Sequence, residues 1–127
     1  MADIKTALVA HLAADAAVAA IVAARIYPRT LPQGCTLPAI RFKRVSGVKD
    51  RVAAIVDSRW QFDCVAGTDI VAANLAAAVT AALHRYSGTV SGTELLWGNQ
   101  EDEYDLDVTQ NTHEYVSSVD VRIVYRE

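Results

Sequence analysis

Cysteine is scarce in this sequence, and its scarcity excludes a disulfide framework. The two cysteines, Cys35 and Cys64, fall in a predicted turn and a predicted strand, and two are too few to staple a small secreted scaffold. We interpret both as free thiols in a reducing cytosol. Cys35 follows Gly34 and could be exposed and reactive, but no neighbour in the sequence would lower its pKa.

An excess of basic charge and a long apolar run are also missing. The formal net charge is −3, whereas nucleic-acid binding normally rests on a basic face. The Ala-rich stretch 13–24 is shorter than the roughly 20 apolar residues that span a bilayer. It does not resemble a signal peptide either, because Asp3 and Asp15 flank and interrupt it and no cleavage site follows. We therefore expect no membrane partner and a protein that stays where it is made.

Catalytic residue types are present, but in no arrangement that predicts chemistry. His11, His84 and His113 lie on three separate predicted elements and form neither an HxxxH nor an HExxH pair. The Gly/Ser-rich run 87–92 lacks the lysine and the following helix of a phosphate-binding loop. The sequence therefore predicts no catalytic, cofactor or metal site, and we expect the protein not to be an enzyme.

What the sequence does contain is typical of one globular domain over residues 1–127. Hydrophobic residues make up 52% of the chain and charged residues 21%, a balance that argues against disorder. A chain of this length can bury about two-thirds of its unfolded surface in a single core.

Capping residues and apolar stripes predict three helices. Asp3 and Asp15 suit the N-caps of two N-terminal helices. Thr68 suits the N-cap of a longer helix, which we expect Gly88 to end. The apolar stripe of this third helix contains Val71, Leu75, Val79, Ala82, Leu83 and Tyr86.

Extended segments fill the rest of the chain. Strands are predicted over residues 25–27, 38–43, 55–65, 95–97, 104–108 and 115–126, with a loop over residues 46–53 and a hairpin turn near Asn111. Alternation is clearest in the last strand, where Val119, Val121 and Ile123 point one way while Asp120 and Arg122 point the other. This order of elements predicts an α+β fold, in which helices pack on one face of a mostly antiparallel sheet and some loops are extended.

The predicted strands carry an asymmetry of charge. Basic residues gather between positions 41 and 51, and acidic residues between positions 94 and 107. The acidic run is no calcium loop, because an EF-hand begun at Asp105 would place Gln110 and Val116 where glycine and glutamate are required. The candidate contact residues are Arg41, Lys43, Arg44, Lys49, Arg51, Glu101, Asp102, Glu103, Asp105 and Asp107.

Two interpretations of this asymmetry remain open. The basic and acidic strands either lie side by side in one subunit and pair their outer faces, or lie on opposite flanks and meet between subunits. Exposed pairs within a subunit contribute only about 0–1 kcal/mol each. A contact between opposite flanks repeats head to tail, and it makes a ring if its rotation closes.

A series of short motifs runs along the chain in a fixed order. After the first helix come DAAVAAIV, RIYP, LPQG, LPAI and SG within residues 15–47. WQFD at 60–63, the helix after Gly67, YDL at 104–106 and VDVR at 119–122 follow. In this order and spacing, over nearly its whole length, the chain resembles the tail-completion proteins of long-tailed bacteriophages, also called tail terminators.

The resemblance implies a structural role at the neck of a virion, with assembly in the host cytoplasm. Proteins similar to this one close as hexameric rings on the head-proximal end of the tail tube. They stop polymerisation of the tube protein and present a surface to head-completion proteins, without a cofactor or an enzymatic activity. Genomic DNA passes through such lumens, which are typically acidic, without specific binding. The resemblance thus makes residues 101–107 a candidate lumen or interface patch.

The mechanism that we expect is geometric. A ring subunit copies one face of a tube subunit and differs on the other, so that growth ends. Loops 29–37 and 46–54 are the expected contact elements, with Arg44, Lys49 and Arg51 as charged contacts. The rival hypotheses are another head–tail adaptor or minor tail protein, and a small oligomeric enzyme whose site forms across a subunit interface from His113 or Cys35.

Overall fold

The computed structural model describes residues 3–50, 52–109 and 114–126. Within these residues the chain forms three helices and six strands. The helices are α1 (Ile4–Ala14), α2 (Ala16–Val22) and α3 (Asp69–Leu83). The strands are β1 (Ile26–Pro28), β2 (Ala39–Asp50), β3 (Ile55–Ala66), β4 (Gly88–Val90), β5 (Thr93–Thr109) and β6 (Glu114–Arg126).

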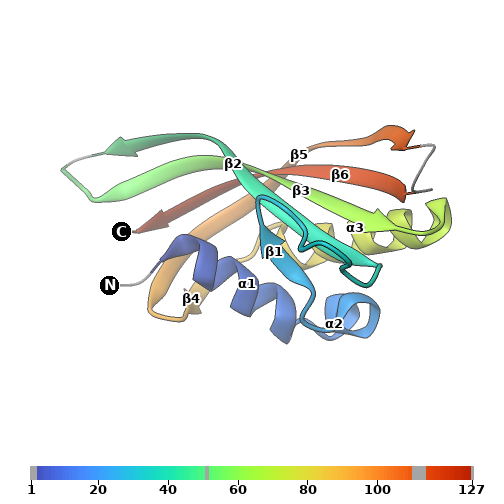
Figure 1. The fold of residues 1–127 in the computed structure, drawn as a ribbon. Coiled ribbons are helices and arrows are strands. Elements are labelled where there is room, and N and C mark those ends of the chain that lie inside the picture. The colour runs from blue at the N-terminus through green and yellow to red at the C-terminus, as the bar shows by residue number, and fades with distance from the viewer. Residues whose placement is uncertain (1–2, 51, 110–113, 127) are drawn as a thin grey trace.

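All six strands belong to one sheet, in the order β1-β2-β3-β6-β5-β4. The short β1 pairs with β2 in parallel, and every other neighbouring pair is antiparallel. Figure 1 shows the three helices on one side of this twisted sheet, with the opposite face left without a helix. The predicted α+β fold, with helices on one face of a mostly antiparallel sheet, is therefore confirmed.

The caps of the helices explain where each helix begins. The carboxylates of Asp3 and Asp15 accept hydrogen bonds from backbone amides in the first turns of α1 and α2, and the Thr68 hydroxyl does the same for α3. All three caps were predicted. The expected end of α3 was wrong, because the helix stops at Leu83 and Gly88 instead opens β4.

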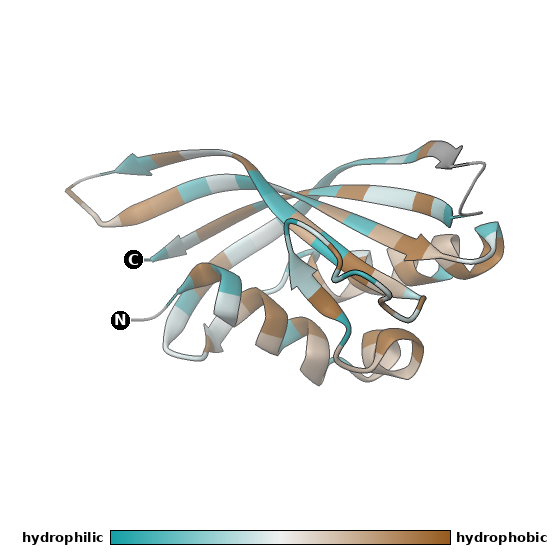
Figure 2. Ribbon diagram, viewed as in Figure 1, coloured by the Kyte–Doolittle hydropathy of each residue, from teal (hydrophilic) through white to brown (hydrophobic). Residues whose placement is uncertain are grey.

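The hydrophobic core lies between the helices and the sheet. Trp60 and Phe62 of β3 are fully buried there, and Phe42 of β2 contacts both, with ring centroids 5.9 and 5.5 Å apart. Figure 2 shows apolar residues along the helices that cover this layer, and Leu8, Leu75 and Val79 are among those buried in the core. In β6, the predicted alternation buries Val119 and Val121 against the helices.

Two segments of the sheet differ from the prediction. Residues 46–50, expected in a loop, continue β2 and pair with residues 55–59 of β3. Residues 95–97 and 104–108, expected as separate strands, belong to the single strand β5. Each difference has a physical reason. The end of β2 is exposed on both faces, so its sequence lacks the alternation of apolar and polar residues that predicts a strand. In β5, three bulges interrupt this alternation.

The end of α3 packs closely on β5, and a glycine makes this possible. A Cβ atom at Gly98 would lie 2.4 Å from the carbonyl oxygen of Leu83. The amide of Arg85 donates a hydrogen bond to the Gly98 carbonyl at 2.7 Å, which ties the helix end to the strand. Gly98 is therefore required for the contact between helix and sheet.

We predict that Gly98→Ala lowers the free energy of unfolding by about 2 kcal/mol, because overpacking against the backbone forces α3 and β5 apart. Urea denaturation followed by circular dichroism measures the loss. Gly67→Ala is the matched control, since a Cβ there meets no atom within 4 Å. Equal stability of the two variants would contradict the prediction.

Candidate assembly surfaces

The sheet face without helices is polar, and its central charges neutralise one another. Among the residues that the structure describes, four ion pairs link neighbouring strands across this face. They are Arg41–Asp63 at 2.9 Å, Arg59–Asp120 at 3.0 Å, Arg126–Glu94 at 3.1 Å, and Arg122–Asp57. The middle of the face is therefore electrically satisfied within the subunit.

Asp63 is the best-enclosed carboxylate of this face, with 7% of its surface exposed. Its oxygens accept hydrogen bonds from Gln61 at 2.7 Å, Ser118 at 2.5 Å and Arg41 at 2.9 Å. Burial acts to raise the pKa of Asp63, but the three hydrogen bonds and the Arg41 charge together hold this pKa below its usual value.

Asp120 anchors a second, neighbouring cluster. Its two oxygens accept hydrogen bonds from Arg59 at 3.0 Å and from the Tyr104 hydroxyl at 3.2 Å. Burial and the nearby Asp120 carboxylate raise the pKa of Tyr104, which stays a neutral donor. Together the two clusters fasten β2, β3, β6 and β5 to one another.

The basic candidates divide into two groups. Arg41 belongs to the internal pair with Asp63, whereas Lys43 and Lys49 are exposed along the outer part of β2. Arg44 donates a hydrogen bond to the Tyr125 hydroxyl at 2.8 Å, and its guanidinium lies 5.0 Å from the Trp60 ring centroid. Arg51 lies outside the described residues.

The acidic candidates lie on β5. Glu101, Asp102 and Glu103 are exposed, and none of them forms an ion pair within the described part of the chain. Asp105 is exposed as well and accepts a hydrogen bond from Ser117 at 3.0 Å. Asp107 belongs to β5 by its backbone, but its side chain lies outside the described residues.

The strand order decides between the two interpretations of the charge asymmetry. β3 and β6 separate the basic strand β2 from the acidic strand β5. Three strand spacings of about 4.8 Å each lie between them. The interpretation in which the two strands lie side by side is therefore wrong, and the charged strands lie on opposite flanks of the subunit.

Both charged strands also present open backbone edges. β1 pairs only with residues 40–42 of β2, and β4 only with residues 93–95 of β5. Within the described residues, 43–50 of β2 and 97–109 of β5 have no strand on their outer side. Such edges carry unpaired amide and carbonyl groups that another chain can pair with.

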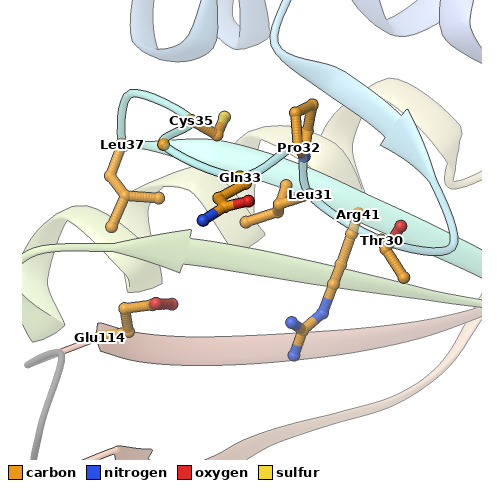
Figure 3. A pocket seen from close by; sticks show the side chains of 9 residues that line it. Thr30, Leu31, Pro32, Gln33, Cys35, Leu37, Arg41 and Glu114 are labelled. Carbon is orange, nitrogen blue, oxygen red and sulfur yellow. The ribbon is translucent and has the colours of Figure 1, made fainter.

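Of the cavities that flank β1 and β2, two are lined in part by the candidate basic residues. The larger, of about 470 Å³, lies under the loop 30–37 and is bordered by Arg41 and Glu114. In Figure 3, Arg41 extends from β2 across β3 and Glu114 approaches from the start of β6, whereas Cys35 points away from Glu114. The smaller, of about 220 Å³, is lined by Lys5, Arg29, Lys43 and Arg44. Lys5 and Arg29 were not predicted at this site, because they lie far from the other two residues along the chain.

The remaining reactive groups have structural surroundings. Burial raises the pKa of Cys64 far above its usual value, so it remains a thiol. His11 Nε2 lies 2.8 Å from the Ala82 carbonyl, and His84 Nδ1 accepts a hydrogen bond from the Gln100 amide at 3.1 Å. His113 lies outside the described residues. Within those residues, no group of three His, Cys, Asp or Glu side chains is placed to hold a metal ion.

Among the described helices, none alone is long and apolar enough to cross a membrane. Only α1 and α2 taken together reach that length and composition, and they are bent by 89° at their junction.

Comparisons with known proteins agree with the motif order. The family model for tail completion protein gp17 matches residues 6–126. The chain belongs to this family. The gp17-family chain also shares its fold with a chain from the virion of a native gene transfer agent particle, with a TM-score of 0.74 at 18% identity, over 98% of this chain and 95% of that one. No curated protein sequence matches it.

Family membership makes the gp17-family chain a structural protein of a phage tail. The resemblance drawn from the motif order is confirmed.

The Asp63 cluster generates a prediction about acid stability of the gp17-family protein. A carboxylate whose pKa is lower in the folded state stabilises the fold above its unfolded pKa of about 3.9, and this contribution is lost as the pH falls through the folded pKa. Asp63→Asn should lower the free energy of unfolding at pH 7 by about 2 kcal/mol and flatten its decline below pH 4. Part of that decline should remain in the variant, because the hydrogen bond from Arg122 also holds the pKa of Asp57 low.

Urea unfolding at pH 7 and at pH 3 measures both effects. Asp69→Asn, at an exposed position in the first turn of α3, serves as the control and should keep the wild-type acid profile. An Asp63→Asn variant with an unchanged acid profile would show that Asp63 is not held ionised by its partners.

Proposed function

We propose that this protein forms a ring that caps the head-proximal end of a phage tail tube, stops tube polymerisation and joins the tail to the head. The coarse role, a structural protein of the tail, follows from the family. The finer role is supported by one observation: charges are paired in the middle of the helix-free face, whereas Lys43 on one flank of the sheet and Glu101, Asp102 and Glu103 on the other form no ion pair within the described residues. A surface of that kind is complementary to a second copy of itself in a head-to-tail arrangement.

The exposed charges of the flanks favour a contact between unlike flanks. Exposed cations follow the outer part of β2, and exposed acids follow β5. Two copies joined by the same flank would bring like charges together, which is unfavourable. A basic flank against an acidic flank avoids this repulsion and leaves a free flank of each kind, so that the contact repeats until the ring closes.

The two long strand pairs at the flanks of the sheet end at opposite ends of it. Ile55, at the start of β3, pairs with Arg126, whereas Ala66, at its end, pairs with Tyr115. Residues 50 and 55 therefore lie at one end of the sheet, and residues 109 and 114 at the other. The β2–β3 hairpin reaches past the helices (Figure 1, left).

Apolar side chains add to the basic flank. Val45 is 51% exposed and Val48 is 73% exposed, although both lie in a paired strand. Ion pairs at an exposed surface contribute only about 0–1 kcal/mol each. Burial of these valines and pairing of open strand edges would supply the remaining stabilisation of a subunit contact.

Termination would follow from two unlike faces of the ring. One ring face copies the surface that a tube subunit offers, and the other meets the head-completion protein. The proposed partners are thus other copies of the chain in a hexamer, the tube protein and the head-completion protein, with DNA passing through the lumen without specific binding. In this proposal the protein acts at the virion neck after assembly in the host cytoplasm, without a cofactor or catalytic step. Residues 101–107 serve the subunit interface.

We predict that Asp102→Lys and Glu103→Lys each weaken capping of purified tail tubes by roughly tenfold, because repulsion replaces attraction at the subunit contact. Tube length by negative-stain microscopy, measured against protein concentration, gives the capping strength. Asp69→Lys makes the same change of charge on α3 and should cap like the wild type.

The effect should also shrink as salt is raised, because the Debye length falls to about 3 Å at 1 M. Tubes that grow unchecked in the presence of the wild-type protein would contradict the proposed function. Binding to a portal-side complex in place of the tube would favour an adaptor.

A further inference from the structure

The smaller cavity gathers four cations from three parts of the chain. Lys5 lies on α1, Arg29 follows β1, and Lys43 and Arg44 belong to β2; together they line a space of about 220 Å³. The Arg29 amide donates a hydrogen bond to the Phe42 carbonyl at 2.7 Å. This bond holds Arg29 at the point where β1 ends and the open edge of β2 begins. We call this space the basic cleft.

The charges of the basic cleft lack compensation. Lys5, Arg29 and Lys43 form no ion pair within the described residues. Arg44 is held in place by the Tyr125 hydroxyl and the Trp60 ring, both of which leave its positive charge intact. Four like charges around one small cavity repel one another, so an anion placed among them would be stabilised.

A second groove, with an apolar lining, lies next to the basic cleft. Val9, Ala10 and Pro28 line this groove, of about 370 Å³, and Lys5 borders both spaces. Asp3 also borders it; its carboxylate accepts hydrogen bonds from the Lys5 amide and the Thr6 hydroxyl at the start of α1, and these neutral donors leave its negative charge intact. An extended peptide with acidic and apolar side chains fits such a site better than a small free anion does.

This chain itself carries a segment of that chemistry. In the acidic edge of β5, Glu101, Asp102 and Glu103 lead into Tyr104 and Leu106, and the three acids form no ion pair in the part of the chain that the structure describes. We propose that the basic cleft binds the acidic β5 edge of a second copy, with Lys5 and Arg29 as specificity-determining contacts. The proposal rests on the ring of the preceding section and assigns it a receiving site.

A peptide titration of the full-length, ¹⁵N-labelled protein tests the cleft without requiring a ring to form. The probe is the peptide of residues 99–108, NQEDEYDLDV, which carries five carboxylates. We expect saturable shifts of the backbone amides around Lys5, Arg29 and Lys43. A peptide with all five acids replaced by their amides should cause none.

Variants sharpen the test. Lys5→Glu and Arg29→Glu should each weaken binding of the acidic peptide by about tenfold. Arg85→Glu, an equal change of charge at an exposed position beyond α3, should bind like the wild type. Shifts that spread over other surfaces, the absence of saturable shifts, or unchanged binding by Lys5→Glu and Arg29→Glu would overturn the proposal.

A ten-nucleotide single-stranded DNA provides the remaining arm of the titration. If it displaces the acidic peptide and binds more tightly, the cleft is a phosphate site and the proposal fails. The result is separable from the proposed function. Peptide binding at the cleft without tube capping would overturn the function alone, whereas tube capping without peptide binding would overturn the cleft alone.

Discussion

The helices cover only one face of the sheet, and the rest of the structure depends on this constraint. The covered face is apolar and carries the core around Trp60 and Phe62. The other face must hold its polar groups in place without a second layer. It does so through ion pairs between neighbouring strands, of which Arg41–Asp63 and Arg59–Asp120 are the most enclosed. Charges in the middle of the sheet are thereby matched within the subunit.

Within the described residues, the same arrangement leaves Lys43 and three acids of β5 without an ion pair, and the proposed function depends on these charges. The basic cleft lies on one flank and the acidic edge of β5 lies on the other, with β3 and β6 between them. A monomer in water can carry such flanks at little cost, because solvent screens them. A subunit of a ring gains specificity from them, since unlike flanks attract and like flanks repel. In a closed ring, the basic flank of each subunit would contact the acidic flank of the next.

The sequence predicted the features that depend on local chemistry and periodicity. It did not predict the features that depend on pairing or packing with distant segments. The caps at Asp3, Asp15 and Thr68 follow from single side chains, and the α+β class follows from the order of the apolar patterns. The strand character of residues 46–50 comes only from pairing with β3, because neither face is buried. The flank assignment required the strand order, and Lys5 and Arg29 join the basic cleft only through the packing of α1 beside β1.

The central claim is that unlike flanks meet between copies, and zero-length cross-linking tests it most directly. Equal amounts of ¹⁴N- and ¹⁵N-labelled protein, assembled on tail tubes, would be treated with a carbodiimide that joins ammonium and carboxylate groups in direct contact. The account predicts mixed-isotope peptide pairs that join Lys5 or Lys43 to Asp102 or Glu103. Cross-links between subunits that avoid these residues, or assemblies in which the two flanks are never joined, would contradict it.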